Sequence, residues 1–477
     1  MSRALVWFRR DLRLDDHPAL QAALKAGHAP VPVYIHAPEE EAPWTPGAAS
    51  RAWLDRSLRS LQAELRRLGS DLIIRRGPST ETLLSLAAET GAEAVYWHRL
   101  YEPASIARDS ATKAALKSQG LHAESLNGAL LVEPWQVQTG NGDPYRVFTP
   151  FWKNARQHLE GNRPLPAPGL LPALPWHDSR ALASLDIDDL GLRPHSREGG
   201  WDVGFWPHWT PGEQGGAELL QAFLEGAVHG YKEQRNFPDR TGTSKLSPYL
   251  HFGEISPRRI VQAIHEASLP AKIQPDLDHY LSELGWREFS HHLLFHFPHT
   301  SDADMNPRFA AFPWADVDAS TLQAWQHGRT GVPIVDAGMR ELWATGWMHN
   351  RVRMVVASFL TKNLRYHWIH GARWFWDTLL DASLPNNTQG WQWSAGTGAD
   401  AAPYFRIFSP VAQAEKFDPK GIYIRRWVPE LASLPDAALA EPWAHGELLS
   451  RLAPGYPCTP IVDVKQSRAE ALAAYSS

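Results

Sequence analysis

Hydrophobic and polar residues recur with different periodicities in the two halves of the chain. In the first half, short runs rich in β-branched and aromatic residues alternate with longer stretches whose apolar residues recur at helical spacing. The short runs are residues 4–8, 31–35, 72–74 and 94–97. Strands that alternate with helices predict a parallel sheet covered by helices, so we expect a Rossmann-like α/β domain.

A helix predicted over residues 50–68 is the clearest of the amphipathic stretches. Gly69 follows it as a natural helix end before the next strand. The apolar residues of this stretch fall near the helical period. They are Trp53, Leu54, Leu58, Leu61, Leu65 and Leu68.

A proline-rich passage with little periodicity follows the α/β pattern and predicts a long connector. Its prolines are Pro164, Pro166, Pro168, Pro172, Pro175, Pro194, Pro207 and Pro211. From about Gly212 onward the periodicity is helical, over residues 217–228, 255–267, 277–297, 335–345 and 350–362. We therefore expect an α/β domain over residues 1–130, a connector over 131–211 and an all-α domain over 212–477.

Composition places the chain among folded globular proteins, with 43% hydrophobic and 21% charged residues in 477. No apolar run approaches the ~18 residues of a membrane span, and charges interrupt the N-terminus MSRALVWFRRDLRLDD. We expect a cytoplasmic monomer without a membrane partner. The single Cys458 excludes an intramolecular disulfide and argues against a structural zinc cluster, so we expect no metal.

Charge and tryptophan are unevenly distributed. The net charge is −5, yet between Arg340 and Glu430 eleven Lys or Arg stand against seven Asp or Glu, a local +4. The chain has 22 Trp, fifteen of them after residue 200. Local positive charge together with aromatic residues indicates a surface for nucleic acid.

Two segments carry candidate polar chemistry. Residues 231–248, YKEQRNFPDRTGTSKLSP, combine hydroxyls, glycine and cations in a loop that could hold a phosphate group, although a solvated turn is the common alternative. No Walker or GxGxxG pattern supports a phosphate site there. Residues 381–400, DASLPNNTQGWQWSAGTGAD, are loop-like and are typical of a binding loop.

Two predicted helices present mixed polar and aromatic faces. In TGWMHNRVRMVVASFL, Trp347, Asn350, Arg351 and Met354 share one face, opposite an aliphatic stripe. Trp and Met are poor choices for solvent, so this face favours a ligand over a solvated surface. SELGWREFSHH repeats the pattern with Glu283, Trp286, Arg287 and Ser290, where a Glu–Arg salt bridge is the alternative interpretation.

Several long motifs, in order and in register, resemble the DNA photolyase and cryptochrome family, most closely the bacterial photolyases that repair cyclobutane pyrimidine dimers. The motifs are LVWFRRDLRL, FTPFWK, GTSKLSP, ELGWREF, TGWMHNRVRM, GWQWSAGTGADAAPYFRIF and EKFD. The resemblance covers nearly the whole chain and implies an antenna-binding α/β domain and a helical domain that holds FAD. The stretch between HHLLFHFP and FPW is similar to that of a related bacterial class.

The resemblance implies residues for the flavin. Those at positions that hold its phosphates are Tyr231, Thr243, Ser244, Lys245, Leu246 and Ser247. Asp381, Arg353 and Asn387 match positions beside the isoalloxazine ring, where photolyases keep Asn and plant cryptochromes often have Asp. Ser383 and Pro385 depart from the acidic and small residues of the family in this loop.

The resemblance also implies a lesion pocket, in which Glu283 is counted with the catalytic residues. The residues that match positions around a dimer flipped out of DNA are Glu283, Trp286, Asn350, Met354 and Trp393. Those that match or neighbour contacts to the lesion and its phosphates are Arg235, Arg287, Arg351, Arg406 and Lys416. Photolyases are themselves an example of base-flipping enzymes in general accounts of this chemistry.

Two further expectations follow from the resemblance. Trp391, Trp368 and Trp314 match a chain that carries electrons from the surface to the flavin, with Trp325 competing with Trp314 as the outer member because the spacing between these two differs by one residue. Glu102 matches a folate position, so methenyltetrahydrofolate is favoured as antenna over a deazaflavin or a second flavin.

Two functions remain as alternatives, both within the family. The first is light-driven repair of pyrimidine dimers by electron transfer from reduced FAD. The second is a blue-light photoreceptor of the cryptochrome type, which keeps the flavin loop, loses the lesion pocket and usually adds a C-terminal tail. We favour repair because the pocket residues are present and the chain continues for few residues beyond PIVD.

Overall fold

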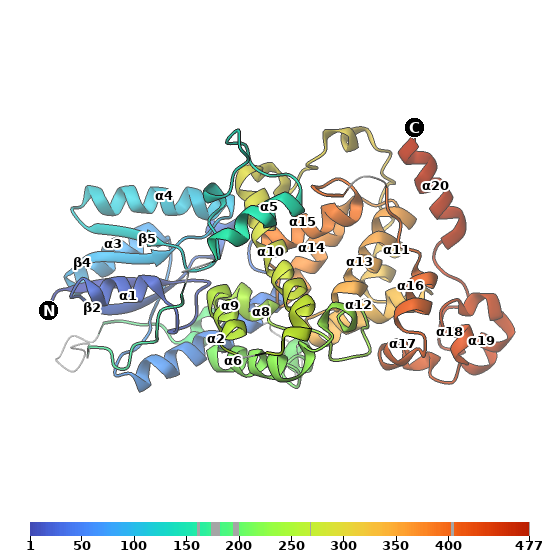
Figure 1. Ribbon diagram of the computed structural model, residues 1–477, viewed down its shortest axis with the longest axis horizontal. Helices are drawn as coiled ribbons and strands as arrows, with labels where there is room; N and C mark the ends of the chain where they lie inside the picture. Colours follow the sequence, from blue (N-terminus) through green and yellow to red (C-terminus); the bar gives the residue numbers. More distant parts are fainter. Residues whose placement is uncertain (160–162, 173–181, 194–199, 268, 402–404, 477) are drawn as a thin grey trace.

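The computed structural model describes residues 1–159, 163–172, 182–193, 200–267, 269–401 and 405–476. Figure 1 shows the strands gathered at the N-terminal end of the molecule and the helices of the second half at the other. The five strands form one parallel sheet in the order β3-β2-β1-β4-β5. They are β1 (Arg3–Phe8), β2 (Ala29–His36), β3 (Ile73–Arg76), β4 (Ala92–His98) and β5 (His122–Leu126). The α/β prediction is confirmed, although β5 was missed.

Both faces of the sheet are buried. In β1, Val6 and Phe8 belong to one hydrophobic cluster, whereas Leu5 and Trp7 belong to another on the opposite face. The strands of a parallel sheet that is covered on both sides have nearly continuous apolar sequences, and this is why these strands could be predicted. The covering helices are α1 (Pro18–Lys25), α2 (Ala48–Arg67), α3 (Ser79–Thr90) and α4 (Pro103–Ser118).

The connector is more structured than the proline pattern predicts. It contains helix α5 (Phe148–Ala155), in which Phe151, Trp152 and Ala155 are buried. Two of the prolines used to recognise the connector, Pro175 and Pro194, lie outside the described residues. Helix α5 lies before Pro164, so it does not fall within the proline-rich passage itself, and it is too short for its apolar face to be recognised in the sequence.

The rest of the chain is helical, as predicted. Its α-helices are α6 (Glu213–Ala222), α7 (Tyr231–Gln234), α8 (Ser247–His251), α9 (Pro257–Glu266), α10 (Gln274–His296), α11 (Ala319–Gln326), α12 (Pro333–Thr345), α13 (Asn350–Ser358), α14 (Trp368–Thr378), α15 (Leu384–Ala395), α16 (Pro410–Phe417), α17 (Ile422–Trp427), α18 (Asp436–Leu439), α19 (Gly446–Leu452) and α20 (Val464–Ser476).

Short 3-10 and π segments join these helices. The π segments are η6 (Phe223–Ala227) and η10 (Phe359–Asn363). The 3-10 segments are η1 (Pro38–Glu41), η2 (Pro134–Gln136), η3 (Arg156–His158), η4 (Ile187–Leu190), η5 (Trp201–Gly204), η7 (Ala271–Ile273), η8 (Pro298–Ser301), η9 (Pro307–Ala311), η11 (Pro429–Leu431) and η12 (Pro442–His445).

Two local predictions were wrong. Residues 381–400 are not mainly a loop, because α15 occupies their centre. Trp347 does not share a helix with Asn350, since Gly346 ends α12 in the left-handed region (φ 68°) and His349 caps the start of α13. The asparagines and glycines that suggested a loop at α15 are tolerated because its helix is packed against α10 and α14.

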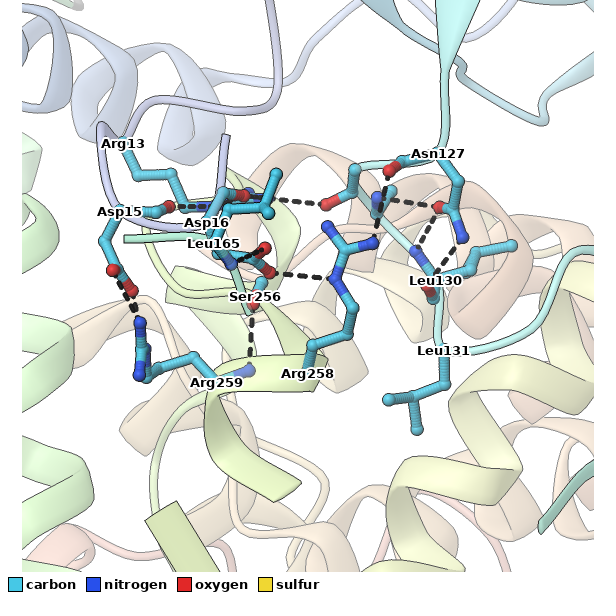
Figure 2. Close-up of polar contacts among 12 residues, drawn as sticks. Arg13, Asp15, Asp16, Asn127, Leu130, Leu131, Leu165, Ser256, Arg258 and Arg259 are labelled. Atoms are coloured by element: carbon cyan, nitrogen blue, oxygen red, sulfur yellow. Dashed lines mark hydrogen bonds and ion pairs between the residues drawn. The ribbon is translucent and has the colours of Figure 1, made fainter. Parts of the chain in front are cut away.

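Ion pairs join the two halves of the molecule (Figure 2). Arg259 at the start of α9 holds both carboxylate oxygens of Asp15 at 2.6 Å, and Arg258 contacts Asp16 at 2.9 Å. Arg13 donates to the carbonyl oxygen of Gly253 at 2.9 Å. Because Asp16 is fully buried, these contacts fix the α/β domain against α8 and α9, where the cavity described below lies.

Candidate active site

A cavity of about 610 Å³ opens where the helical half meets the α/β domain. Its walls come from α7, α8, α10, α13 and α15, together with loops that follow the sheet strands. This volume lies within the range of small-molecule and cofactor sites. Gly390 of α15 lines the cavity, and a Cβ atom there would meet no atom within 4 Å, so the missing side chain leaves room for a ligand.

The loop between α7 and α8 brings only part of the predicted phosphate set to the cavity. Tyr231, Ser244, Leu246 and Ser247 line it. Lys245 does not: its backbone is left-handed (φ 53°) and its Nζ lies 5.8 and 5.3 Å from the ring centroids of Trp209 and Trp347. The side chain of Lys245 is thus directed between two indoles and away from the cavity.

Thr243 is likewise absent from the cavity wall. The preceding Gly242 explains the path of the chain, because a Cβ atom there would lie 2.5 Å from the carbonyl oxygen of Gln234. This close approach folds the loop back onto α7. The two hydroxyls of Ser244 and Ser247 are therefore the side chains of this loop that remain available to an anion in the cavity.

Three residues predicted beside a flavin ring meet at one wall. Arg353 of α13 donates to both carboxylate oxygens of Asp381, at 3.1 and 2.8 Å. Asn387, near the start of α15, donates its amide N–H to the carbonyl oxygen of Ala372 at 2.8 Å, which leaves its Oδ1 for a ligand. All three line the cavity.

Several buried polar atoms around this cavity have no hydrogen-bond partner among the described residues. They are Arg351 Nε, Gln389 Oε1 and Trp391 Nε1, and each belongs to a residue that lines the cavity. Leaving buried polar groups unpaired is costly. The cavity therefore fits a large ligand with polar edges, as a flavin dinucleotide has.

The face predicted for a lesion also lines this cavity. Glu283, Trp286, Asn350, Met354 and Trp393 all belong to its wall. Figure 1 shows that α10, α13 and α15, which carry these side chains, lie together in the middle of the molecule. The sequence thus predicted residues from three helices that the fold brings to one cavity.

Glu283 does not pair with Arg287, contrary to the alternative interpretation of this helix. Its Oε1 accepts from Arg235 at 2.7 Å, and Arg235 also contacts His279 at 2.9 Å. Burial raises the pKa of Glu283, although Arg235 opposes this shift. Arg287 instead pairs with the buried Glu288 at 3.0 Å. Arg287 also lines the cavity, so its predicted role toward DNA stays a prediction.

The remaining cations lie at the rim of the cavity or outside it. Arg351 lines the cavity and stacks over Phe417, 4.5 Å from the ring centroid. The Nζ of Lys416 lies 5.2 Å from the same ring, and Arg406 lies 5.7 Å from the ring of Trp393. Lys416 and Arg406 are exposed. Positive charge thus surrounds the aromatic rim, as binding to a phosphate backbone requires.

The three tryptophans predicted to carry electrons differ in their surroundings. Trp391 lines the cavity and packs against α14, since a Cβ atom at Gly371 would lie 2.1 Å from its ring. Trp368 lies one turn before Gly371 on α14 and donates its indole N–H to Asp304 at 2.8 Å. His367 lies between Trp368 and Trp314, with ring centroids at 5.4 and 5.1 Å.

Trp325 does not have the position of an outer donor. It is fully buried, its ring lies 6.1 Å from that of Trp391, and its indole N–H donates to the carbonyl oxygen of Val356. Trp314 is half-buried. Of these two candidates for the outer end of the series, only Trp314 reaches solvent.

Glu102 lies at the far wall of the cavity, where it precedes α4. It forms an ion pair with Arg10 at 2.7 Å. Burial would raise its pKa, but Arg10 and His291 outweigh burial and lower the pKa to about 2. A second cavity of about 70 Å³ lies nearby, between the sheet and α14, with Trp7, Arg108 and Trp376 among its lining residues.

A buried cluster of Asp11, His17 and His98 has the residue types of a metal site, but one nitrogen of each histidine is already occupied by a backbone N–H. Backbone N–H groups of Leu20 and Ala19 donate to His17 Nδ1 and His98 Nε2. The other ring nitrogens therefore carry protons and face Asp11 Oδ2, at 3.3 and 2.8 Å. Burial lowers the pKa of His98 to about 3, so the cluster is a neutral-histidine anchor for the loop after β1.

Other residues around the site gave little signal in the sequence. Asn236, which accepts from Arg351, and Asp304 and His367 beside the tryptophans are isolated polar residues in loops or at a helix start. Phe148 stood within a recognised motif, but nothing in its spacing indicated what it contacts. Such residues are recognisable only from the tertiary contacts.

Lys362 supports α15 from within the core. It is fully buried in η10, donates to the carbonyl oxygen of Ala395 at the end of α15, and lies 3.2 Å from the centroid of the Phe405 ring. Burial lowers its pKa well below the usual value. In the part of the chain that the structure describes, no carboxylate forms an ion pair with it.

Lys362→Met is expected to flatten the rise of the unfolding free energy with pH. Between the folded and unfolded pKa values of this lysine only the unfolded chain binds the proton, so wild-type stability rises with pH, by up to about 1.4 kcal/mol per unit. Urea unfolding between pH 6 and 9 measures this slope. The exposed Lys416→Met serves as control, and equal slopes for wild type and Lys362→Met would contradict the expectation.

Comparison with known proteins identifies the family. Residues 4–169 match the family described as DNA photolyase, and residues 280–477 match the FAD binding domain of DNA photolyase. The chain belongs to the DNA photolyase family. Its helical half is therefore an FAD-binding domain, in agreement with the resemblance seen in the sequence.

Relatives cover nearly the whole photolyase chain. It is 44% identical over 479 residues to deoxyribodipyrimidine photo-lyase of Agrobacterium fabrum, covering 99% of this chain and 97% of that protein. It is also 40% identical to cryptochrome-2 of Arabidopsis thaliana, covering 92% of this chain and 72% of that protein. Full-length photo-lyase relatives of this similarity identify the chain as an enzyme of the photo-lyase type.

A solved structure agrees with this family. The crystal structure of a bacterial class III photolyase from Agrobacterium tumefaciens is 43% identical, has a TM-score of 0.93 and covers 100% of this chain and 97% of its own. A cryptochrome from Synechocystis is 30% identical, with a TM-score of 0.89. Among the described residues, no helix is both long and apolar enough to span a membrane.

Proposed function

We propose that this photolyase uses near-ultraviolet or blue light to split cyclobutane pyrimidine dimers that are flipped out of DNA. The observation that carries the proposal is that a single cavity contains both residue sets, with Asp381 and Asn387 of the flavin set and Trp286 and Trp393 of the lesion set among its lining. Bound FAD supplies the redox chemistry, whereas the protein binds, orients and shields the reacting groups.

In this proposal the residues of the flavin set have different roles. Tyr231, Ser244 and Ser247 would hold the phosphates, with Leu246 completing the wall, and Asn387 would face the ring. The Arg353–Asp381 ion pair would offer a carboxylate to the ring without leaving a bare buried charge. For Thr243 and Lys245 we propose a role through their backbone alone, because their side chains are absent from the cavity wall.

The lesion set would receive the dimer in an apolar slot. Trp286 and Trp393 offer ring faces, Met354 fills the space between helices, and Asn350 and Glu283 offer hydrogen bonds to a pyrimidine edge. Arg235 would act through Glu283, whose Oε1 accepts from it. Arg351, Arg406 and Lys416 would hold flanking phosphates, and Arg287 is better suited to fix α10.

A blue-light receptor function is the second candidate, because plant cryptochromes reach 38–40% identity over 92–98% of this chain. The two functions place different demands on the same cavity. Repair needs a slot that admits a flipped pyrimidine dimer, whereas a receptor needs only the flavin. The presence of both lesion tryptophans at the cavity wall supports repair.

We further propose the electron path Trp391, Trp368 and Trp314, and an antenna chromophore between the domains. Methenyltetrahydrofolate stays the favoured antenna, with a deazaflavin as alternative, although the Glu102 carboxylate is already paired with Arg10. We propose domain limits of 1–130 and 212–477 around the connector, which agree with a sheet that ends at Leu126 and helices that begin again at Glu213.

A repair assay tests the proposed function. Purified protein is expected to carry about one FAD and to restore thymine dimers in an oligonucleotide under near-ultraviolet or blue light. The dark reaction is the control, because the electron comes from a photoexcited flavin. Equal repair in darkness would overturn the light-driven mechanism. No repair in light with fully reduced flavin would overturn the repair function and leave the receptor function.

A further inference from the structure

We propose that Phe148 of the connector is a positioning residue for Trp286, holding its indole at the angle on which a flipped base stacks. This inference rests on the proposed repair function and adds a third aromatic residue to the lesion slot, one supplied from outside the helical domain. It concerns the face of Trp286 that is turned away from the cavity.

The two rings are stacked face to face. Their centroids lie 3.8 Å apart and their planes differ by 9°. Trp286 lines the cavity and Phe148 does not, so Phe148 covers the side of the indole that a ligand cannot reach. Close packing of two rings buries apolar surface on both of them and so holds the indole of Trp286 in one orientation.

Phe148 is itself held in place by neighbours on two helices. Its ring stacks at 6.5 Å on Trp152 of α5 and meets Phe289 of α10 edge-on at 6.0 Å. A Cβ atom at Gly285 would lie 2.6 Å from the Trp152 ring, so α5 packs directly against α10. The position of Phe148 is thus determined by packing and does not depend on the lesion.

A carboxylate from the segment after α15 lies near the start of α5. Burial raises the pKa of Asp400, and the backbone N–H of Phe148 opposes this shift. Asp400 has a left-handed backbone (φ 57°), which is uncommon for a non-glycine residue. The preceding Ala399 lines the cavity, and Trp393 belongs to the helix just before.

This arrangement ties the two lesion tryptophans to one another. Trp286 on α10 is backed by Phe148, and the backbone N–H of Phe148 faces the carboxylate of Asp400, which follows the helix that carries Trp393. A ring that is already held in its bound orientation loses less conformational freedom when a base stacks on it. We infer that α5 sets the geometry of the slot and so contributes to discrimination between damaged and undamaged DNA.

Phe148→Leu is the decisive variant, because it keeps an apolar side chain but removes the stacked ring. We expect about three- to tenfold weaker binding to an oligonucleotide with a thymine dimer, and less than about twofold change for undamaged DNA. Phe148→Tyr keeps the ring and is expected to bind like wild type. Equilibrium titrations at fixed salt, with thermal unfolding of each variant, give these values.

Phe151→Leu is the matched control on the same helix. Phe151 is buried and contacts Phe289 and His292, but it makes no ring contact with Trp286. Phe151→Leu is expected to lower the midpoint temperature of unfolding without changing the ratio of the affinities for damaged and undamaged DNA. Asp400→Gly removes the carboxylate and introduces a residue that adopts the left-handed backbone without strain. This variant should shift the ratio of the affinities for damaged and undamaged DNA in the same direction as Phe148→Leu, by about two- to threefold.

Three results would overturn the inference, and they are distinguishable. If Trp286→Ala weakens binding to damaged DNA while Phe148→Leu and Asp400→Gly do not, Phe148 has no positioning role but the lesion slot stands. If Trp286→Ala itself leaves the affinity ratio unchanged, the proposed slot is wrong and the inference falls with it. A Phe151→Leu variant that changes the ratio as much as Phe148→Leu would assign the effect to general loosening of α5.

Discussion

Replacing Trp391 or Trp368 with Phe is expected to block light-driven reduction of oxidised flavin by an external thiol, yet to permit repair once the flavin has been reduced chemically. Phe keeps most of the aromatic volume and lacks the readily oxidised indole, so the substitution separates packing from electron transfer. Trp391 is the member of the series that lines the cavity. Its loss should therefore interrupt the path at its inner end.

Absorption spectra recorded during illumination measure this effect directly. Trp314→Phe should act like Trp368→Phe, because Trp314 is the half-buried member joined to Trp368 through His367. Trp325→Phe is the matched control, since Trp325 is fully buried although it contacts Trp391. Photoreduction lost in Trp325→Phe and retained in Trp314→Phe would reassign the path.

Trp368→Phe has a second consequence that must be separated from the first. Asp304 accepts the indole N–H of Trp368, and the side chain of Asp304 is largely buried. Removing the donor leaves a carboxylate with one fewer partner, which lowers stability by about 1–3 kcal/mol. The double variant Trp368→Phe with Asp304→Asn should regain part of this stability without regaining photoreduction.

The α/β domain could be predicted from the sequence because its strands are buried on both faces and read as short apolar runs. The missed strand β5 has the sequence HAESL, in which polar residues interrupt the run, and it lies at the edge of the sheet. An edge strand has one neighbour instead of two, so its pattern is weaker. Helix α15 was misread because asparagine and glycine, which favour loops, lie in a helix stabilised by packing.

The residues of the site were predicted from the resemblance of their motifs to a known family. The structure shows which of them line the cavity and which contact other residues instead. The sequence placed Lys245 among phosphate-binding residues, whereas the fold directs its ammonium group between Trp209 and Trp347. Likewise, the partner of Glu283 is Arg235, 48 residues away in the chain, in place of the helical neighbour Arg287. Spacing along one helix predicts local pairs, but the choice between a local and a distant partner depends on tertiary packing.

The stacking of Phe148 on Trp286 illustrates the same limit for aromatic residues. Both residues stood in recognised motifs, FTPFWK and ELGWREF, but no periodicity connects positions so far apart. Contact between them depends on Gly285, which lets Trp152 approach α10. The sequence therefore indicated which residues were special, and the packing of α5 on α10 explains how two of them act together.

Trp286→Ala and Trp393→Ala are each expected to weaken binding of dimer-containing DNA by about 5- to 150-fold, because a base stacked on an aromatic side chain contributes ~1–3 kcal/mol. Undamaged duplex keeps its bases inside the helix and should be affected much less. Titrations of both DNAs with each variant, at one salt concentration, give the discrimination ratio. An unchanged ratio in Trp286→Ala would show that the slot is assigned to the wrong residues.

Arg351→Ala is the contrasting variant for this last experiment. Arg351 lies at the cavity wall, stacked over Phe417 beside the exposed Lys416, so a phosphate is its expected partner. A phosphate contact releases a counterion whether or not the DNA is damaged. Arg351→Ala should therefore weaken both DNAs alike and reduce the salt dependence by about one phosphate contact. Arg351→Ala could instead abolish the preference for damaged over undamaged DNA while Trp286→Ala and Trp393→Ala keep it. That result would assign lesion recognition to the rim of the cavity and not to the slot.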